Sequence, residues 1–402
     1  HTNKKGKTTK LLKLSKNLYG HPLAGIVFYK YLVEKVKTLG LELVGNESCL
    51  LYNKKLDTFL LIYVDDVIIF DKNPTAEKRL QLIQELGKIG VDMKITLENS
   101  MTDIEFTFIG LTCTLEKVND EQRISFHKPV EVEKFFKSLK IQKTSKHSTT
   151  PYFELMNHEE ASMPYTGTVS LKSVQEFVGY ITYISQHRPD IIFITNYLQI
   201  HLHRFNQHYL KIAGILLNYL SHNPIKKFTY TIDKTIDNCI KVYTDSNHGG
   251  DFTGFSNGCI MIEIFGLLVL GKTSLNRIIS FSSTHAEIYT INKNHEMIDS
   301  IIALVNEIMI IVHHPKMLLN PSIYIDNQAV INILENVTRF KNKFQDIHIA
   351  KFRQKIVEGN YGLYHIDTKM NKADIGTKPL PKASFCHLLN LIGDSSQNTN
   401  LE

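Results

Sequence analysis

The sequence predicts a multidomain protein of mixed class, α+β in one part and α/β in another. Its 402 residues are enough for two or three domains that each bury their own core. Short apolar runs typical of strands occupy 59–70, apolar residues recur at helical spacing over 171–184, and from Cys239 strand and helix patterns alternate. These observations predict an antiparallel sheet with helices, then connecting helices, then a mixed five-stranded sheet with helices.

The expected elements follow in order along the chain. A helix over 26–40 leads into the strand pair of 59–70, and a further strand is expected over 105–115. Residues 143–168 are rich in Ser, Thr, His and Pro and show little periodicity, which predicts a linker. The C-terminal elements are a strand at 239–244, turns at Asn257-Gly258 and Phe265-Gly266 around a second strand, a helix from Thr284, and strands at 322–325 and 361–366.

Composition and charge limit the class of protein. Hydrophobic residues make up 43% and charged residues 21%, an ordinary balance for a globular protein. The net charge of +6 suits a polyanion partner, although the lysines crowded at the start are equally typical of a solvated basic tail. Scattered cysteines indicate reduced thiols in an intracellular protein, and no run reaches the roughly 18 apolar residues of a membrane span. The first residue is histidine rather than methionine, which indicates a fragment of a longer protein.

Two adjacent aspartates, Asp65 and Asp66, stand where two apolar runs meet. Two carboxylates about 4 Å apart repel by roughly 4 kcal/mol at an effective dielectric constant near 20, so a site that keeps both ionised needs a cation. The pair therefore indicates a divalent metal site. The alternative is a plain hairpin turn, because aspartate is common in turns.

Tyr63-Val64-Asp65-Asp66 between apolar strands resembles the polymerase hairpin of reverse transcriptases. Upstream, Lys-Leu-Ser-Lys-Asn-Leu-Tyr-Gly at 13–20 resembles the segment before this hairpin in Ty/copia-type retrotransposon polymerases. Downstream, Phe-Ile-Gly-Leu at 108–111 is similar to the next short strand of that family. The resemblance implies that Asp65 and Asp66 bind the catalytic metal and that Tyr63 packs near the primer end.

Four acidic residues mark the C-terminal part. Asp245 ends a strand in Tyr-Thr-Asp-Ser, and Glu287 is expected in the first turn of a helix in Ser-Ser-Thr-His-Ala-Glu. Asp326 ends a strand in Tyr-Ile-Asp-Asn-Gln, and Asp374 falls in Asn-Lys-Ala-Asp-Ile-Gly-Thr-Lys-Pro-Leu. Each segment resembles its counterpart in the Ty/copia nuclease domain, and the order of strands and helices is that of the ribonuclease H fold.

Cleavage of a phosphodiester explains why carboxylates are required. Two divalent ions about 3.5 to 4 Å apart clamp the attacking and leaving oxygens, and hard oxygen ligands suit Mg²⁺ or Mn²⁺. The resemblance implies that Asp245 is shared by both ions, that Glu287 and Asp326 bind one, and that Asp374 binds the other.

Each of these acids also has a structural alternative. Thr284 and Glu287 are spaced as a capping box, which would stabilise the helix end by roughly 1 kcal/mol. Asp326 and Asp374 could be N-caps, and Asp245 could close an Asx-turn. The set of four at the family's spacing favours the metal site over four separate coincidences.

Other polar residues have weaker assignments. Gln328, with Asn327, could bond the 2′-hydroxyl that distinguishes RNA from DNA, or could belong to an ordinary polar helix start. His201 and His208 could share a helix face, but a structural zinc site requires four ligands. His365 is expected in a strand, as a buried or edge histidine.

The sequence departs from the family in three places. A reverse transcriptase palm needs another aspartate from an upstream strand, and nothing before Lys16 supplies it. His21-Pro22 replaces the usual residues in a loop near the incoming nucleotide. The loop 368–372 lacks the mobile histidine that often assists product release in ribonuclease H.

These observations identify the chain as resembling the C-terminal part of a Ty/copia-type LTR retrotransposon Gag-Pol polyprotein, with RNA-directed DNA synthesis lost through truncation and ribonuclease H activity retained. The resemblance implies RNA, DNA, RNA:DNA hybrids and other Gag-Pol segments as partners, no membrane, and a cytoplasmic virus-like particle or the nucleus as location; a dimer stays open. The alternatives are an inactive relic and a cellular interaction module. The predicted parts are a partial reverse transcriptase at 1–142, a linker and connecting helices at 143–225, a ribonuclease H domain at 226–392, and a disordered tail at 393–402.

Overall fold

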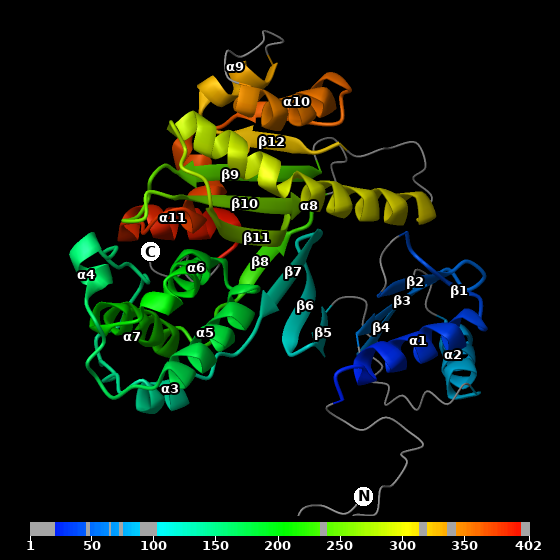
Figure 1. Cartoon of the computed structure of the whole chain (residues 1–402). Coiled ribbons are helices and arrows are strands. Elements are labelled where there is room, and N and C mark those ends of the chain that lie inside the picture. Colours follow the sequence, from blue (N-terminus) through cyan, green and yellow to red (C-terminus); the bar gives the residue numbers. More distant parts are fainter. Residues whose placement is uncertain are drawn as a thin grey trace, which may run out of the picture. The chain divides into compact units, whose positions relative to one another are not determined.

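The computed structural model describes residues 21–45, 49–63, 66–71, 75–88, 103–233, 239–312, 320–335 and 343–394 (Figure 1). The chain divides into two compact units, His1–Leu97 and Glu98–Glu402. Helices and both antiparallel and mixed sheets are present, so the predicted fold class is confirmed. The division does not follow the predicted boundaries between polymerase, connecting and nuclease parts, which stay predictions.

In its described residues, the first unit contains an antiparallel sheet of order β1-β2-β3-β4 and two helices. The hairpin expected over 59–70 is formed by β3 and β4, with Tyr63 opposite Asp66. Alternate residues of β3, Leu60 and Ile62, point inward and pack with Leu32 of the first helix. The elements are α1 (Ala24–Lys37), β1 (Leu41–Leu43), β2 (Leu50–Asn53), β3 (Thr58–Tyr63), β4 (Asp66–Asp71) and α2 (Ala76–Lys88).

A four-stranded antiparallel sheet opens the second unit. The single strand expected over 105–115 is wrong, because Ile109 and Gly110 both have positive φ and form a two-residue turn between two strands. The fourth strand comes from much later in the chain and pairs with the third. The strands are β5 (Asp103–Phe108), β6 (Leu111–Val118), β7 (Glu121–His127) and β8 (Phe228–Thr231).

The other sheet of this unit is the mixed five-stranded sheet that the sequence predicted. Its order is β11-β10-β9-β12-β13, antiparallel from β11 to β9 and parallel from β9 to β13. Phe265 and Gly266 form a turn as expected, whereas Asn257 and Gly258 lie inside a strand, where a Cβ at Gly258 would collide with Thr290. The strands are β9 (Ile240–Asn247), β10 (Ser256–Ile264), β11 (Leu267–Asn276), β12 (Ser322–Ile325) and β13 (Gly362–His365).

The linker expected over 143–168 is wrong as a description of the structure. Phe153 and Met156 are buried in the large core of the second unit, and the Met156 N–H donates to the Tyr197 hydroxyl at 3.0 Å. A loop-like composition therefore covers a segment that is fixed by tertiary contacts. The helices of this region are α3 (Glu133–Ser138), α4 (His158–Ser162), α5 (Leu171–Ser185), η1 (Pro189–Ile191), α6 (Ile192–Ile200), η2 (Leu202–Arg204) and α7 (Gln207–His222).

Further helices cover the five-stranded sheet, with α8 running along β9 and β10 (Figure 1). Gly393 and Asp394, assigned to a disordered tail, are part of the fold: Asp394 is buried and its carboxylate lies 2.8 Å from Lys226 Nζ. The rest of that tail lies outside the described residues. No helix in the described ranges has the length and apolarity to cross a membrane. The elements are α8 (Ser283–Ile311), α9 (Gln328–Glu335), α10 (Lys343–Val357), η3 (Thr368–Met370), η4 (Lys372–Gly376) and α11 (Lys382–Ile392).

Candidate metal centre

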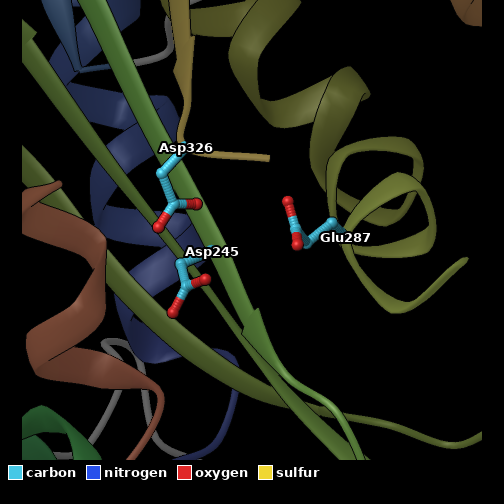
Figure 2. Close-up of side chains that lie close together, drawn as sticks. All are labelled: Asp245, Glu287 and Asp326. Carbon is cyan, nitrogen blue, oxygen red and sulfur yellow. The ribbon is translucent and has the colours of Figure 1, made fainter. Parts of the chain in front are cut away.

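Three carboxylates meet at one edge of the five-stranded sheet. Ligand atoms of Asp245, Glu287 and Asp326 all lie within 4.8 Å of one another, and Figure 2 shows Glu287 facing the two aspartates. Asp245 lies on β9 and Asp326 follows the parallel neighbour β12, whose last register pair is Tyr243 opposite Tyr324. Because each aspartate comes two residues after its tyrosine, both side chains leave the same face of the sheet.

Glu287 reaches the site from α8, which packs across β9 and β10. It is the fifth residue of the helix, so the expected first-turn position is wrong. Ser282 is the N-cap and its hydroxyl accepts from the His285 N–H at 3.1 Å, which excludes the capping box between Thr284 and Glu287. The Glu287 carboxylate is therefore turned to the sheet rather than to the helix end.

At the helix starts after Asp326 and near Asp374, neighbouring asparagines and not the aspartates accept the backbone N–H groups. Asn327 accepts from the backbone N–H two residues later at 3.0 Å, at the start of α9. Asn371 caps η4, and its amide also donates to the Thr244 carbonyl at 3.0 Å, which fixes η4 against β9. Asp245 lies inside a strand and its carboxylate accepts from Thr377 Oγ1 at 2.8 Å, so it closes no Asx-turn.

Burial and mutual repulsion make the carboxylates difficult to ionise in the absence of a cation. Burial and the adjacent Asp374 raise the pKa of Asp245 to about 7, against the opposing bond from Thr377. Burial and the charges of its acidic neighbours raise the pKa of Glu287 to about 8. Burial and the charge of Asp245 also raise the pKa of Asp326. A bound cation would favour the ionised form of all three.

One oxygen of Glu287 is placed where it could bind a cation. Oε1 accepts from Asn327 Nδ2 at 2.9 Å, while Oε2 is buried and has no hydrogen-bond partner in the described structure. A buried polar atom without a partner is costly, and an oxygen aimed into a cluster of carboxylates suits a hard cation. The donor set therefore fits a divalent metal ion.

Asp374 adjoins Asp245 but is not one of the three mutually close carboxylates. Its Oδ1 lies 2.9 Å from Lys378 Nζ. Although burial lowers the pKa of Lys378, the charge of Asp374 and of the other carboxylates raises it, so the lysine remains a cation. Thr377 and Lys378 were not singled out from the sequence, although both stand in the motif around Asp374.

The remaining predicted residues lie elsewhere. Gln328 is exposed and its amide bonds Asn332 at 3.1 Å along α9, so the structure does not bring it to the carboxylates. Tyr63 and Asp66 are exposed at the end of the β3–β4 hairpin, whereas Asp65 lies outside the described residues. Of the two aspartates in the predicted polymerase metal site, the structure therefore describes only Asp66.

The histidines form no shared site in the described structure. His201 is buried and pairs with Asp251 at 2.9 Å, whereas His208 lies 3.1 Å from Glu160, so each has its own carboxylate. His365 ends the edge strand β13 and its Nε2 lies 3.2 Å from the Asp326 carbonyl oxygen. The expected edge position of His365 is confirmed, and it places the ring beside the metal centre.

Comparison with known proteins is consistent with the motifs. No family model matches the chain. Over 397 residues it is 24% identical to the truncated transposon Ty1-A Gag-Pol polyprotein of Saccharomyces cerevisiae, a match that covers 96% of this chain and 32% of that one. It is 25% identical over 401 residues to the transposon TyH3 Gag-Pol polyprotein of Saccharomyces cerevisiae, covering 22% of that protein.

The chain is homologous to Ty1 Gag-Pol polyproteins. The predicted resemblance to a Ty-type retrotransposon Pol polyprotein is thereby confirmed. The chain spans about a third or less of the length of these relatives.

Two solved structures are more distant matches to the chain. LC11-RNase H1, isolated from compost, is 18% identical with a TM-score of 0.27 and matches 35% of this chain and 93% of its own. The foamy viral protease-reverse transcriptase in complex with an RNA/DNA hybrid is 11% identical with a TM-score of 0.41. The match covers 87% of this chain and 39% of the viral chain.

Proposed function

We propose that this chain hydrolyses the RNA strand of RNA:DNA hybrids with Mg²⁺ or Mn²⁺ held at the carboxylate cluster. The observation that carries the proposal is the approach of Asp245, Glu287 and Asp326, from three separate elements, to within 4.8 Å of one another. Desolvated carboxylates this close repel unless a cation lies between them. Oxygen-only ligands favour a hard divalent ion over zinc.

The proposed roles follow from these contacts. Bound divalent ions would make a water nucleophilic and stabilise the leaving 3′-oxygen of the phosphodiester. Asp245, Glu287 and Asp326 would hold one ion, and Asp245 with Asp374 would hold the second. Gln328 is exposed and bonds Asn332, and a contact of its amide with the 2′-hydroxyl stays a prediction.

Neighbouring side chains would orient these ligands. Asn327 donates to Glu287 Oε1 and Thr377 donates to Asp245 Oδ2, so each carboxylate keeps one oxygen fixed and presents the other. Lys378 balances the charge of Asp374 and would limit the repulsion within the empty or partly loaded cluster. None of these three residues needs to contact the substrate.

The homology to Gag-Pol polyproteins supports nucleic acids and other polyprotein segments as partners. A location in cytoplasmic particles or the nucleus, and a dimer, stay predictions. DNA synthesis is not included in the proposal: Asp66 joins no group of three metal-ligating side chains among the described residues, and Asp65 lies outside them. An inactive relic that only binds nucleic acid is the competing function.

The test is cleavage of a labelled RNA strand in an RNA:DNA hybrid by the full 402-residue chain with Mg²⁺. Asp326→Asn removes a ligand and should abolish cutting, whereas Glu176→Gln, an exposed acid on α5, should leave the rate unchanged. EDTA should stop the parent. Absence of metal-dependent cutting by a folded chain that binds Mg²⁺ would establish the relic instead.

A further inference from the structure

The second unit contains a pocket of about 770 Å³, and none of the residues that line it belongs to the metal centre. One wall of the pocket is formed by residues of the segment 139–152. This segment is held to α7 where the Thr144 N–H donates to Asn218 Oδ1 at 2.8 Å. Gly214 permits this close approach, because a Cβ there would lie 3.3 Å from Ile141. The floor is one face of α7 at helical spacing: Gln207, Leu210, Lys211, Gly214, Ile215 and Asn218.

The charge of the pocket is of one sign. Lys140, Lys146 and Lys211 line it together with His147, and none of its lining residues, all of which lie in the described structure, is acidic. Lys140 donates to Thr168 Oγ1 at 2.6 Å and keeps further N–H groups. Lysine recurs at every third position from 134 to 146, although Lys143, outside the pocket, pairs with Glu133 of α3. Such a surface attracts a polyanion.

Aromatic side chains accompany the lysines. Tyr152 lines the pocket with 51% of its surface exposed, and Tyr165 is half-buried with its hydroxyl accepting from the Val169 N–H at 2.8 Å. Leu139 in the wall and Leu210 in the floor add apolar surface. Lysines that contact phosphates, combined with aromatic faces on which bases stack, are the features that bind single-stranded nucleic acid.

We propose that this pocket binds a single-stranded segment of nucleic acid. Lys146 and Lys211 contact successive phosphates, and Tyr152 stacks on a base. Pockets of about 300 to 1,000 Å³ hold ligands of nucleotide size. A duplex would hide the base faces that the tyrosines and leucines require, which favours a single strand. The binding needs no metal ion and is independent of the carboxylate cluster.

The experiment measures anisotropy of a labelled single-stranded oligonucleotide of about 12 nucleotides with the full chain in EDTA, over about 50 to 300 mM KCl. Removing both phosphate contacts in a Lys146→Gln/Lys211→Gln variant should lower the slope of log K against log salt by about 1.4, at about 0.7 for each contact. Lys172→Gln/Lys382→Gln removes the same charge at exposed residues outside the pocket and should change the slope little. Tyr152→Ala should weaken binding about tenfold without changing the slope.

Equal slopes for the two double variants would overturn the proposal. So would a loss confined to an RNA:DNA hybrid of the same length, because it would assign the lysines to duplex phosphates. Circular dichroism checks that the exposed substitutions leave the fold intact. Hydrolysis of a short hybrid with Mg²⁺ is measured separately, so failure of the nuclease proposal and failure of the pocket proposal give different results.

Discussion

Replacing Glu287 by glutamine should stabilise the metal-free protein at alkaline pH while it abolishes hydrolysis. The pKa of Glu287 is about 8 in the fold against an ordinary 4.5, so the folded protein retains a proton that the unfolded chain has lost. Stability then falls as the pH rises from 4.5 to about 8 and is level above that. Glutamine removes this dependence because it never ionises.

The structure sets the magnitude. At about 1.36 kcal/mol for each pH unit between 4.5 and about 8, ionised Glu287 costs the fold at most about 5 kcal/mol. Burial is the largest part of this cost, and repulsion from Asp245 and Asp326 adds to it. Because these acids titrate together, one substitution recovers only part of the cost, on the order of 2 kcal/mol. Glutamine keeps the bond from Asn327 to Oε1, and its amide replaces an oxygen that has no partner.

The assay is chemical denaturation of the full chain in EDTA at about pH 8.5 and about pH 5.5, on either side of most of this titration. The gain from Glu287→Gln should be largest at the higher pH, and Mg²⁺ should stabilise the parent more than the variant. Glu176→Gln, on an exposed helix face, should show no gain at either pH. A variant that is no more stable than the parent at pH 8.5 would refute the reasoning that the carboxylates repel one another.

Three further outcomes are expected. Gly376→Ala should lower hydrolysis at least tenfold and should also lower the melting temperature, because the added Cβ would collide with Cys259 and displace η4. Cleavage assays and thermal scans of the same preparation measure the two effects. Arg188→Met should cost about 3–5 kcal/mol in denaturation, since it leaves Asp190 buried without its two guanidinium bonds of 2.9 and 2.7 Å. A fragment of residues 226–402 should unfold at lower denaturant than the whole second unit, because it keeps the core of the five-stranded sheet but lacks the α5, α6 and α7 part of the other core.

The sequence predicted those features of the site that depend on local pattern. Alternating apolar residues before Asp245 and a short apolar run before Asp326 gave two strands with an acid after each, and both strands are present. The helix that carries Glu287 was also predicted, and its start, expected near Thr284, lies at Ser283. Ser282, Ser283 and Thr284 are all good N-caps, and the choice among them depends on how α8 packs on the sheet rather than on propensity.

What the sequence could not supply is the tertiary setting of the middle of the chain. The composition of 143–168 is that of a loop, yet Phe153 and Met156 are buried by residues of α6 that lie far along the chain. The predicted strand over 105–115 failed for a related reason, because the turn at Ile109 and Gly110 lacks the Asn-Gly or Asp-Gly pair typical of such turns.

The helices that the sequence assigned to a connection are part of the support of the candidate metal centre. α6 packs against both β11 and η4, and η1 packs against η4 as well. Ala373 and Ile375, on either side of Asp374, lie in the same hydrophobic core as Ile194 and Leu198 of α6. The position of Asp374, a proposed metal ligand, is thus supported by a helix that precedes the whole five-stranded sheet. Substitutions in the core of α6 should therefore lower hydrolysis without touching an acid, which distinguishes this arrangement from a nuclease domain joined to its neighbour by a passive linker.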